Sequence, residues 1–282
     1  MIKRILIITL LLLLVLSLTI ACSNTETDSE EKPEKDYTVE VSHEDSYLMV
    51  KLELLDHVKT VKDNKFSYED LTEVYIPASV EEIGRKAFAY NNIREIEIPN
   101  SVKEIGDSAF RGNNLEKIKI SDNIKKINAQ TFRNNNLISI EIPDNIEKIG
   151  NRAFNNNNLK SVEIPNSVIE IDDRAFQNNL LTEVEIPDNV TIISTKVFAS
   201  NDLTEIEIPD SVEEIHMGAF AFNNIETVKM PDDVEVSDDA FIRSRYSNTH
   251  GKYSLANVYK ENNQAAGTYF RDNVGHWHFD KP

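Results

Sequence analysis

The chain has 282 residues, with 48 Asp and Glu against 30 Lys and Arg, so its formal net charge is −18 at pH 7. A charge of this sign argues against nucleic acids and anionic membrane surfaces as partners, and it favours solubility and cationic ligands. The single cysteine, Cys22, excludes an intrachain disulfide and a cysteine-based zinc site.

Residues 1–21 have the pattern of an export signal peptide. Two basic residues precede an apolar run that ends at Ile20, and the small Ala21 stands before Cys22. The segment Thr19-Ile-Ala-Cys22 resembles the lipobox of bacterial lipoproteins, with Thr19 at a position usually held by Leu. The resemblance implies lipidation of Cys22 and a lipid anchor on the extracellular side of the bacterial cell membrane. The alternative is an uncleaved anchor, because the apolar run is near the lower limit of ~17 residues for a spanning helix.

Residues 22–36 are expected to form a disordered acidic tether. Apart from Pro33, residues 23–36 carry no apolar side chain, so this stretch cannot bury enough surface to fold. A flexible chain of this length has a root-mean-square reach of roughly 20 Å. The tether would therefore hold the domain that follows it clear of a membrane surface.

A repeat of 22 residues fills most of residues 37–241 and decides the architecture. Two residue types mark it, with Ser121 in the one gap of the proline series: Phe88, Phe110, Phe132, Phe154, Phe176, Phe198 and Phe220, and Pro77, Pro99, Pro143, Pro165, Pro187, Pro209 and Pro231. An earlier, degenerate unit ends at Phe66, as terminal repeats often do. The segment from Tyr37 to Val41 alternates and predicts a strand that caps the start.

In each unit, Leu-x-x-Ile-x-Ile has the alternation and β-branched residues of a short strand with one buried face. The expected strands are Met49–Leu54, Leu71–Ile76, Ile93–Ile98, Leu115–Ile120, Leu137–Ile142, Leu159–Ile164, Leu181–Ile186, Leu203–Ile208 and Ile225–Met230. Val-x-x-Ile then turns a second apolar edge inward, and Ala-Phe places a ring beneath a tight turn.

An asparagine follows each phenylalanine of the repeat by three residues. The series is Asn91, Asn113, Asn135, Asn157, Asn179, Asn201 and Asn223. Stacked turns would align these side chains as a ladder that satisfies backbone groups, because a buried amide is tolerated only when its hydrogen bonds are made. We interpret the asparagines and the phenylalanines as structural columns rather than as rows of ligand contacts.

The pattern Leu-x-x-Ile-x-Ile-Pro-x-Ser-Val-x-x-Ile-Gly-x-x-Ala-Phe-x-x-Asn-x, best kept in Ile93–Asn114, resembles the BspA-type leucine-rich repeat family of bacterial surface proteins. The resemblance covers residues 49–241. It implies a right-handed solenoid of about nine units with a parallel β-sheet on one face and little helix. Several members of that family act as adhesins, which implies a role in protein binding on the cell surface.

Residues 242–282 change character and are expected to form a small C-terminal cap. The segment Tyr259–Tyr269, together with Trp277, resembles a short tail that often follows such repeats, and covering the open end of the core is its expected role. A small binding module is the alternative. The pair His276 and His278, with Asp272 and Asp280 nearby, would make half a zinc site, but without an assured third ligand we interpret the pair as surface histidines of the cap.

Outward positions of the expected strands form columns at ~4.8 Å spacing. One column runs Glu53, Tyr75, Glu97, Lys119, Glu141, Glu163, Glu185, Glu207 and Lys229. Stacked glutamates repel one another, so either the charge is useful or the repeat was simply duplicated. The candidate protein-binding residues in this column are Tyr75, Glu97, Glu141, Glu163, Glu185 and Glu207. Tyr75 is the one aromatic side chain among them.

The sequence contains no nucleophile elbow, no Walker loop and no His-Glu-x-x-His motif. We therefore expect no enzyme activity, no cofactor and no metal. The main hypothesis is a monomeric surface lipoprotein whose acidic sheet face binds a protein partner, for which a basic surface is the matching chemistry. The alternatives are a structural component of the cell envelope and a metal-binding tail protein without a ligand on the sheet face.

Overall fold

The computed structural model describes residues 35–282, apart from 45–46, 243–253, 273–275 and 281–282. The predicted export signal, the lipidation site Cys22 and nearly all of the predicted tether therefore lie outside the described residues. From Asp36 onward the chain forms one compact unit. Within the described ranges, no helix has the length and apolar character needed to cross a membrane.

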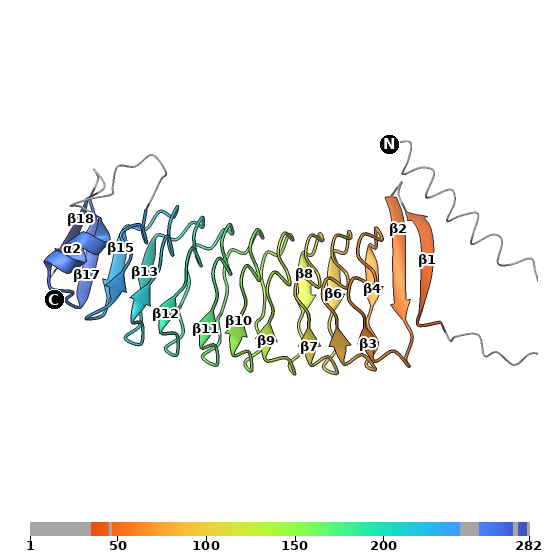
Figure 1. The fold of residues 1–282 in the computed structure, drawn as a ribbon. Coiled ribbons are helices and arrows are strands. Elements are labelled where there is room, and N and C mark those ends of the chain that lie inside the picture. Colours follow the sequence, from red (N-terminus) through yellow and green to blue (C-terminus); the bar gives the residue numbers. More distant parts are fainter. Residues whose placement is uncertain (1–34, 45–46, 243–253, 273–275, 281–282) are drawn as a thin grey trace, which may run out of the picture. The chain divides into compact units, whose positions relative to one another are not determined.

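The unit is a β-solenoid of about eight turns of about 22 residues, and successive turns lie side by side along the coil in Figure 1. One ladder of parallel strands comes from the Leu-x-x-Ile-x-Ile segments: β2 (Tyr47–Leu54), β4 (Glu73–Tyr75), β6 (Glu95–Glu97), β8 (Lys117–Lys119), β13 (Glu205–Glu207) and β15 (Thr227–Met230). These strands confirm the predicted parallel sheet. The first ladder is the name used below for this row.

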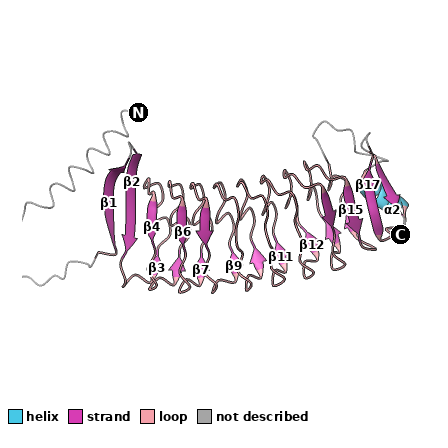
Figure 2. Ribbon diagram, turned by 180° about the vertical axis from the view of Figure 1, so that it is seen from behind, coloured by secondary structure: helices cyan, strands magenta, loops and turns pink. Residues whose placement is uncertain are grey.

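A second ladder comes from the Val-x-x-Ile segments, for which only an inward apolar edge was predicted. Its strands are β3 (Thr60–Val61), β5 (Glu82–Ile83), β7 (Glu104–Ile105), β9 (Lys126–Ile127), β10 (Lys148–Ile149), β11 (Glu170–Ile171), β12 (Ile192–Ile193), β14 (Glu214–Ile215) and β16 (Glu235–Val236). Each two-residue strand points its second residue into the core. Figure 2 shows both sets of strands from behind.

The prediction of nine strands of six residues was wrong in the middle of the first ladder. Between β8 and β13 the structure has no strand of this ladder, and a single parallel bridge joins Glu141 to Glu163. The outward side chains here are Glu141, Glu163 and Glu185. Repulsion between like charges does not by itself account for the gap, because like charges also stand opposite each other in the second ladder, where Glu82 faces Glu104 and Lys126 faces Lys148.

The phenylalanines form a continuous stack through the core, as predicted. Neighbouring rings from Phe66 to Phe241 have centroids 5.0–5.9 Å apart and are near parallel. Two edge-on rings close the stack, Tyr37 at 5.0 Å from Phe66 and Trp277 at 6.3 Å from Phe241. Rings offset or turned in this way keep favourable aromatic contacts while filling the narrow interior.

The predicted asparagine ladder is also present. Asn157 is typical: its Oδ1 accepts from the Leu137 amide at 3.1 Å, and its Nδ2 donates to the carbonyls of Phe132 and Phe154, both at 3.0 Å. All seven ladder asparagines are at least nine-tenths buried. Their amides therefore satisfy backbone groups that the turn would otherwise leave without partners.

Two residues in most turns have left-handed backbone angles, and they flank the core phenylalanine. Lys86 has φ 53° and Tyr90 has φ 60°, and the same pair of positions recurs at steps of 22 residues. Only glycine takes this conformation without strain, and Gly112 and Gly218 occupy two of these positions. Most of the other left-handed positions are occupied by residues other than glycine, such as Lys86 and Tyr90.

The ends of the solenoid are covered differently. At the start, β1 (Tyr37–Glu44) pairs antiparallel with β2, which confirms the predicted capping strand. At the end, α2 (Leu255–Glu261) and the strands β17 (Gly267–Arg271) and β18 (Trp277–Asp280) form the predicted cap, with β17 antiparallel to β15. The Tyr259 hydroxyl donates to the Pro231 carbonyl at 2.7 Å and accepts from the Val234 amide at 3.0 Å.

Candidate protein-binding face

The first ladder exposes the predicted column of side chains. Its inward residues, such as Ile96 and Ile206, are buried in the core, whereas the outward residues on either side of them are exposed. All six predicted residues lie on outward, exposed positions: Tyr75, Glu97, Glu141, Glu163, Glu185 and Glu207. Tyr75 stands opposite Glu53, where β2 and β4 pair, and its side chain is 53% exposed.

Two of the predicted glutamates are neutralised by a lysine in the next turn. Lys119 Nζ lies 2.6 Å from Glu97 Oε1, and its hydrogen bond to the Glu97 carboxylate raises the pKa of Lys119. Lys229 forms an ion pair with Glu207 in the same way. These ion pairs could have been predicted from the sequence, because Lys119 follows Glu97 and Lys229 follows Glu207 directly in the column. The sequence-based list of binding residues did not take the two pairs into account.

The remaining three glutamates form a separate group, which we call the glutamate column: Glu141, Glu163 and Glu185. They occupy three consecutive turns, and within the described part of the chain no ion pair reaches any of them. Exposed Ser139 and Ser161 lie beside them on the neighbouring outward positions. The result is a strip of concentrated negative charge at the point where the ladder has fewest strands.

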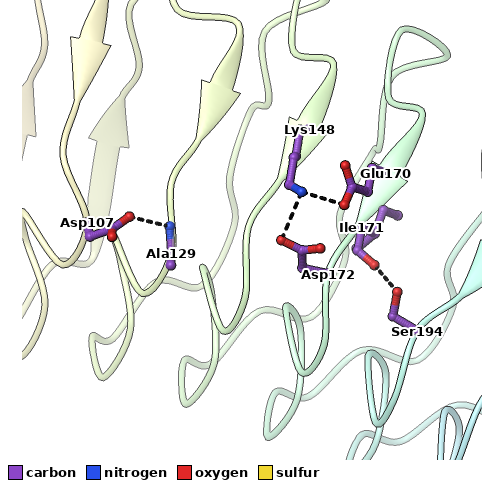
Figure 3. A network of polar contacts seen from close by, with 7 residues as sticks. All are labelled: Asp107, Ala129, Lys148, Glu170, Ile171, Asp172 and Ser194. Atoms are coloured by element: carbon purple, nitrogen blue, oxygen red, sulfur yellow. Dashed lines mark hydrogen bonds and ion pairs between the residues drawn. The ribbon is translucent and has the colours of Figure 1, made fainter.

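Several charges in and beside the second ladder are paired across neighbouring turns. Lys103 and Lys125 contact glutamates of adjacent turns at 2.7 and 3.0 Å. Lys148 lies between Glu170 and Asp172, with the Asp172 contact at 3.3 Å (Figure 3). These pairs lower the net charge of this face, whereas Glu82 and Glu104, which stand opposite each other in β5 and β7, form no ion pair among the described residues.

The two histidines of the cap lie near one carboxylate. Asp272 Oδ2 lies 2.8 Å from His278 Nε2 and 3.9 Å from His276 Nδ1. Among the described residues, no group of three or more His, Cys, Asp or Glu side chains is arranged to hold a metal ion. Asp272 Oδ2 lies within hydrogen-bonding distance of the His278 imidazole and makes a longer ion-pair contact with His276.

The repeat that builds this face matches the family model of the BspA-type leucine-rich repeat region, in six copies over residues 59–178 and 125–248. The chain belongs to the BspA-type leucine-rich repeat family. The family assignment agrees with the solenoid, with the parallel ladders and with the structural columns of Phe and Asn.

Solved structures show the same fold. A leucine-rich cell surface protein from Faecalibacterium prausnitzii is 28% identical, with a TM-score of 0.50, and the match covers 68% of this chain and 56% of that protein. A leucine-rich repeat protein from Eubacterium ventriosum is 22% identical, with a TM-score of 0.50, over 69% of this chain and 58% of that one. The BspA-type chain thus spans little more than half the length of either relative. A search of curated proteins gave no significant match.

Proposed function

We propose that this BspA-type protein is a cell-surface scaffold, anchored through a lipid on Cys22, that binds a basic protein partner through the glutamate column. Leucine-rich repeat proteins typically bind proteins, and the F. prausnitzii relative is a cell surface protein. The scaffold acts as a monomer and without catalysis. Residues 22–36 serve as its tether, residues 37–241 as the binding solenoid and residues 242–282 as the cap.

One observation carries the proposal: among the described residues, three exposed carboxylates in consecutive turns have no ion-pair partner, whereas Glu97 and Glu207 of the same column each pair with a lysine. A rigid row of like charges raises the local potential, which speeds the encounter with an oppositely charged surface and selects against acidic partners. The solenoid holds the row in place before binding, so little ordering is needed when the partner arrives.

The test compares two sets of substitutions in the same column. The triple variant Glu141→Gln, Glu163→Gln, Glu185→Gln removes the free carboxylates, and the double variant Glu97→Gln, Glu207→Gln removes the paired ones. Partners are captured by cross-linking on intact cells, and binding of the captured protein is then measured at low and high salt.

We expect the triple variant to lose about tenfold or more in affinity together with most of the salt dependence, because screening acts on exposed charges. The double variant should change affinity by about twofold or less, since each of its glutamates is already neutralised. Equal effects from the two variants, or none from the triple, would reject the glutamate column as the site.

A further inference from the structure

The edge of the solenoid that carries the core phenylalanines holds a group of basic side chains. Four arginines lie on four consecutive turns of this edge, and we call them the arginine row: Arg111, Arg133, Arg152 and Arg174. All four are half-buried, and within the described residues none of them forms an ion pair. In a chain with a formal charge of −18, such a concentration of unpaired positive charge calls for an explanation.

The arginines come from two different positions of the repeat. Arg111 and Arg133 follow their phenylalanines by one residue, and Arg152 and Arg174 precede theirs by two. Gln130 precedes its phenylalanine by two residues, as Arg152 and Arg174 do. Arg133 Nη1 donates to Gln130 Oε1 at 3.0 Å, so the two repeat positions lie next to each other within one turn. Burial lowers the pKa of Arg133, and the neighbouring charges of Arg111 and Arg152 lower it further.

The guanidinium of Arg133 is held by a chain of amides. Its Nε donates to Asn155 Oδ1 at 3.1 Å, and Asn155 Nδ2 in turn donates to the Gln177 carbonyl at 3.0 Å. Asn155 is buried, so this chain fixes the arginine in one orientation. A planar guanidinium that is already oriented loses less entropy when it forms a paired hydrogen bond to a carboxylate.

Aromatic residues flank the row at its amino-terminal end. The rings of Tyr68 and Tyr90 are stacked with centroids 4.6 Å apart, and the guanidinium carbon of Arg111 lies 5.5 Å from the Tyr90 ring centroid. Tyr68 is 69% exposed, and the buried Nε of Arg111 has no hydrogen-bond partner among the described residues. Tyrosine and arginine are the residues that most often carry the binding energy of protein interfaces.

We propose that the arginine row, together with Tyr68 and Tyr90, is a docking surface for an acidic polypeptide segment of a partner protein. Arginine forks match carboxylates in shape and charge, and the tyrosine pair offers an exposed apolar contact beside them. The surface and the sign of the partner's charge both differ from those of the glutamate column, so the failure of either proposal leaves the other intact.

The probe is a fluorescently labelled oligoglutamate peptide of about twelve residues, long enough to cross four turns at ~3.4 Å per extended residue. Binding to the protein is measured by fluorescence anisotropy. We expect the double variant Arg133→Gln, Arg152→Gln to weaken binding by about tenfold, because two charge-assisted contacts are lost. The single variant Arg174→Gln should weaken it by a smaller factor without any effect on folding, since the Arg174 side chain makes no hydrogen bond in the described structure.

The matched control, Lys103→Gln with Lys125→Gln, removes the same charge from lysines already paired with glutamates. It should leave binding within about twofold. Wild-type affinity in both arginine variants would overturn the proposal. So would a polyuronate chain that binds as tightly as the peptide and with the same arginine dependence, because the surface would then accept a polysaccharide rather than a protein segment.

Discussion

Each ladder asparagine makes several buried hydrogen bonds to the backbone and so contributes to the stability of its turn. Asn157 satisfies one amide and two carbonyls that are buried with it. Removing its side chain leaves these groups without partners in a place that water does not reach. The cost of such unsatisfied groups is the reason that the repeat keeps asparagine here.

We expect Asn157→Ala to lower the free energy of unfolding by about 2–4 kcal/mol, because buried polar groups lose their hydrogen bonds. Unfolding in urea measures the change. The neighbouring Asn158→Ala is the control, since Asn158 is exposed and its side chain makes no hydrogen bond in the described structure. An equal loss in both variants would show that the ladder bonds contribute nothing specific.

The left-handed positions offer a substitution that should stabilise the protein. Lys86 has φ 53°, in a region that costs an L-residue ~1–2 kcal/mol. Lys86→Gly should therefore raise the unfolding free energy by up to about 1 kcal/mol, after the greater freedom of glycine in the unfolded chain is counted. Lys86→Val should lower it, because a β-branched residue fits this region worst. The order Gly above Lys above Val in thermal unfolding is the expected result, and any other order contradicts it.

At the scale of the strands, the group around Lys148 in β10 links two adjacent turns of the second ladder. Burial opposes the charged form of Lys148, but hydrogen bonds to Glu170 and Asp172 outweigh it and raise its pKa. The Lys148 hydrogen bond lowers the pKa of Glu170. Burial, followed by the neighbouring Glu170, raises the pKa of Asp172 above its ordinary value of 3.8.

These directions predict a pH dependence. Glu170 contributes stability above its ordinary pKa of 4.5 and loses it as the pH falls through the lowered value. The contribution of Asp172 has the opposite sign. Because its pKa is raised in the folded protein, ionised Asp172 lowers the free energy of unfolding once the pH exceeds its ordinary value of 3.8. We expect Asp172→Asn to raise the midpoint of thermal unfolding at pH 7, with the difference shrinking towards pH 3.8. A lower midpoint at pH 7 would mean that the Lys148 contact outweighs the cost of burial.

At the scale of the whole molecule, the solenoid behaves as a stack of equivalent turns, each in contact mainly with its neighbours. Deleting residues 150–171 removes one complete 22-residue unit and joins β10 to Asp172, which has the same repeat position as Gly150. The shortened protein should fold with an unchanged circular dichroism spectrum and a modestly lower stability.

Deleting residues 150–160 instead removes half a unit and serves as the comparison. Phenylalanines and asparagines beyond the deletion would then fall out of register with those before it, so the two parts could not share one core. We expect this variant to lose the single cooperative unfolding transition. Retention of that transition would show that the columns do not define the stacking.

The 22-residue period was sufficient to predict the coil, the Phe stack and the Asn ladder, because each depends on residues that repeat at a fixed position. The two end structures were predicted from segments outside the period, namely the alternation of Tyr37–Val41 and the tail segment Tyr259–Tyr269 with Trp277. Two other features depend on residues that vary between turns. The glutamate column depends on which turns carry a lysine in the outward column, and the arginine row joins Arg133 with Arg152 from different repeat positions. A repeat alignment separates those two arginines, whereas the folded turn places them side by side.

The asparagine ladder also has a direction. Asn157 bonds to Phe132 and Leu137, which belong to the preceding turn, and Asn223 serves the preceding turn in the same way. A chain that emerges amino end first can therefore finish each turn only after the asparagine of the next turn has appeared. Beyond Asn223, Tyr259 and Gln264 of the cap take over by bonding to Val234. During synthesis or export, an interrupted chain would thus expose one incomplete turn, while every turn behind it is already closed.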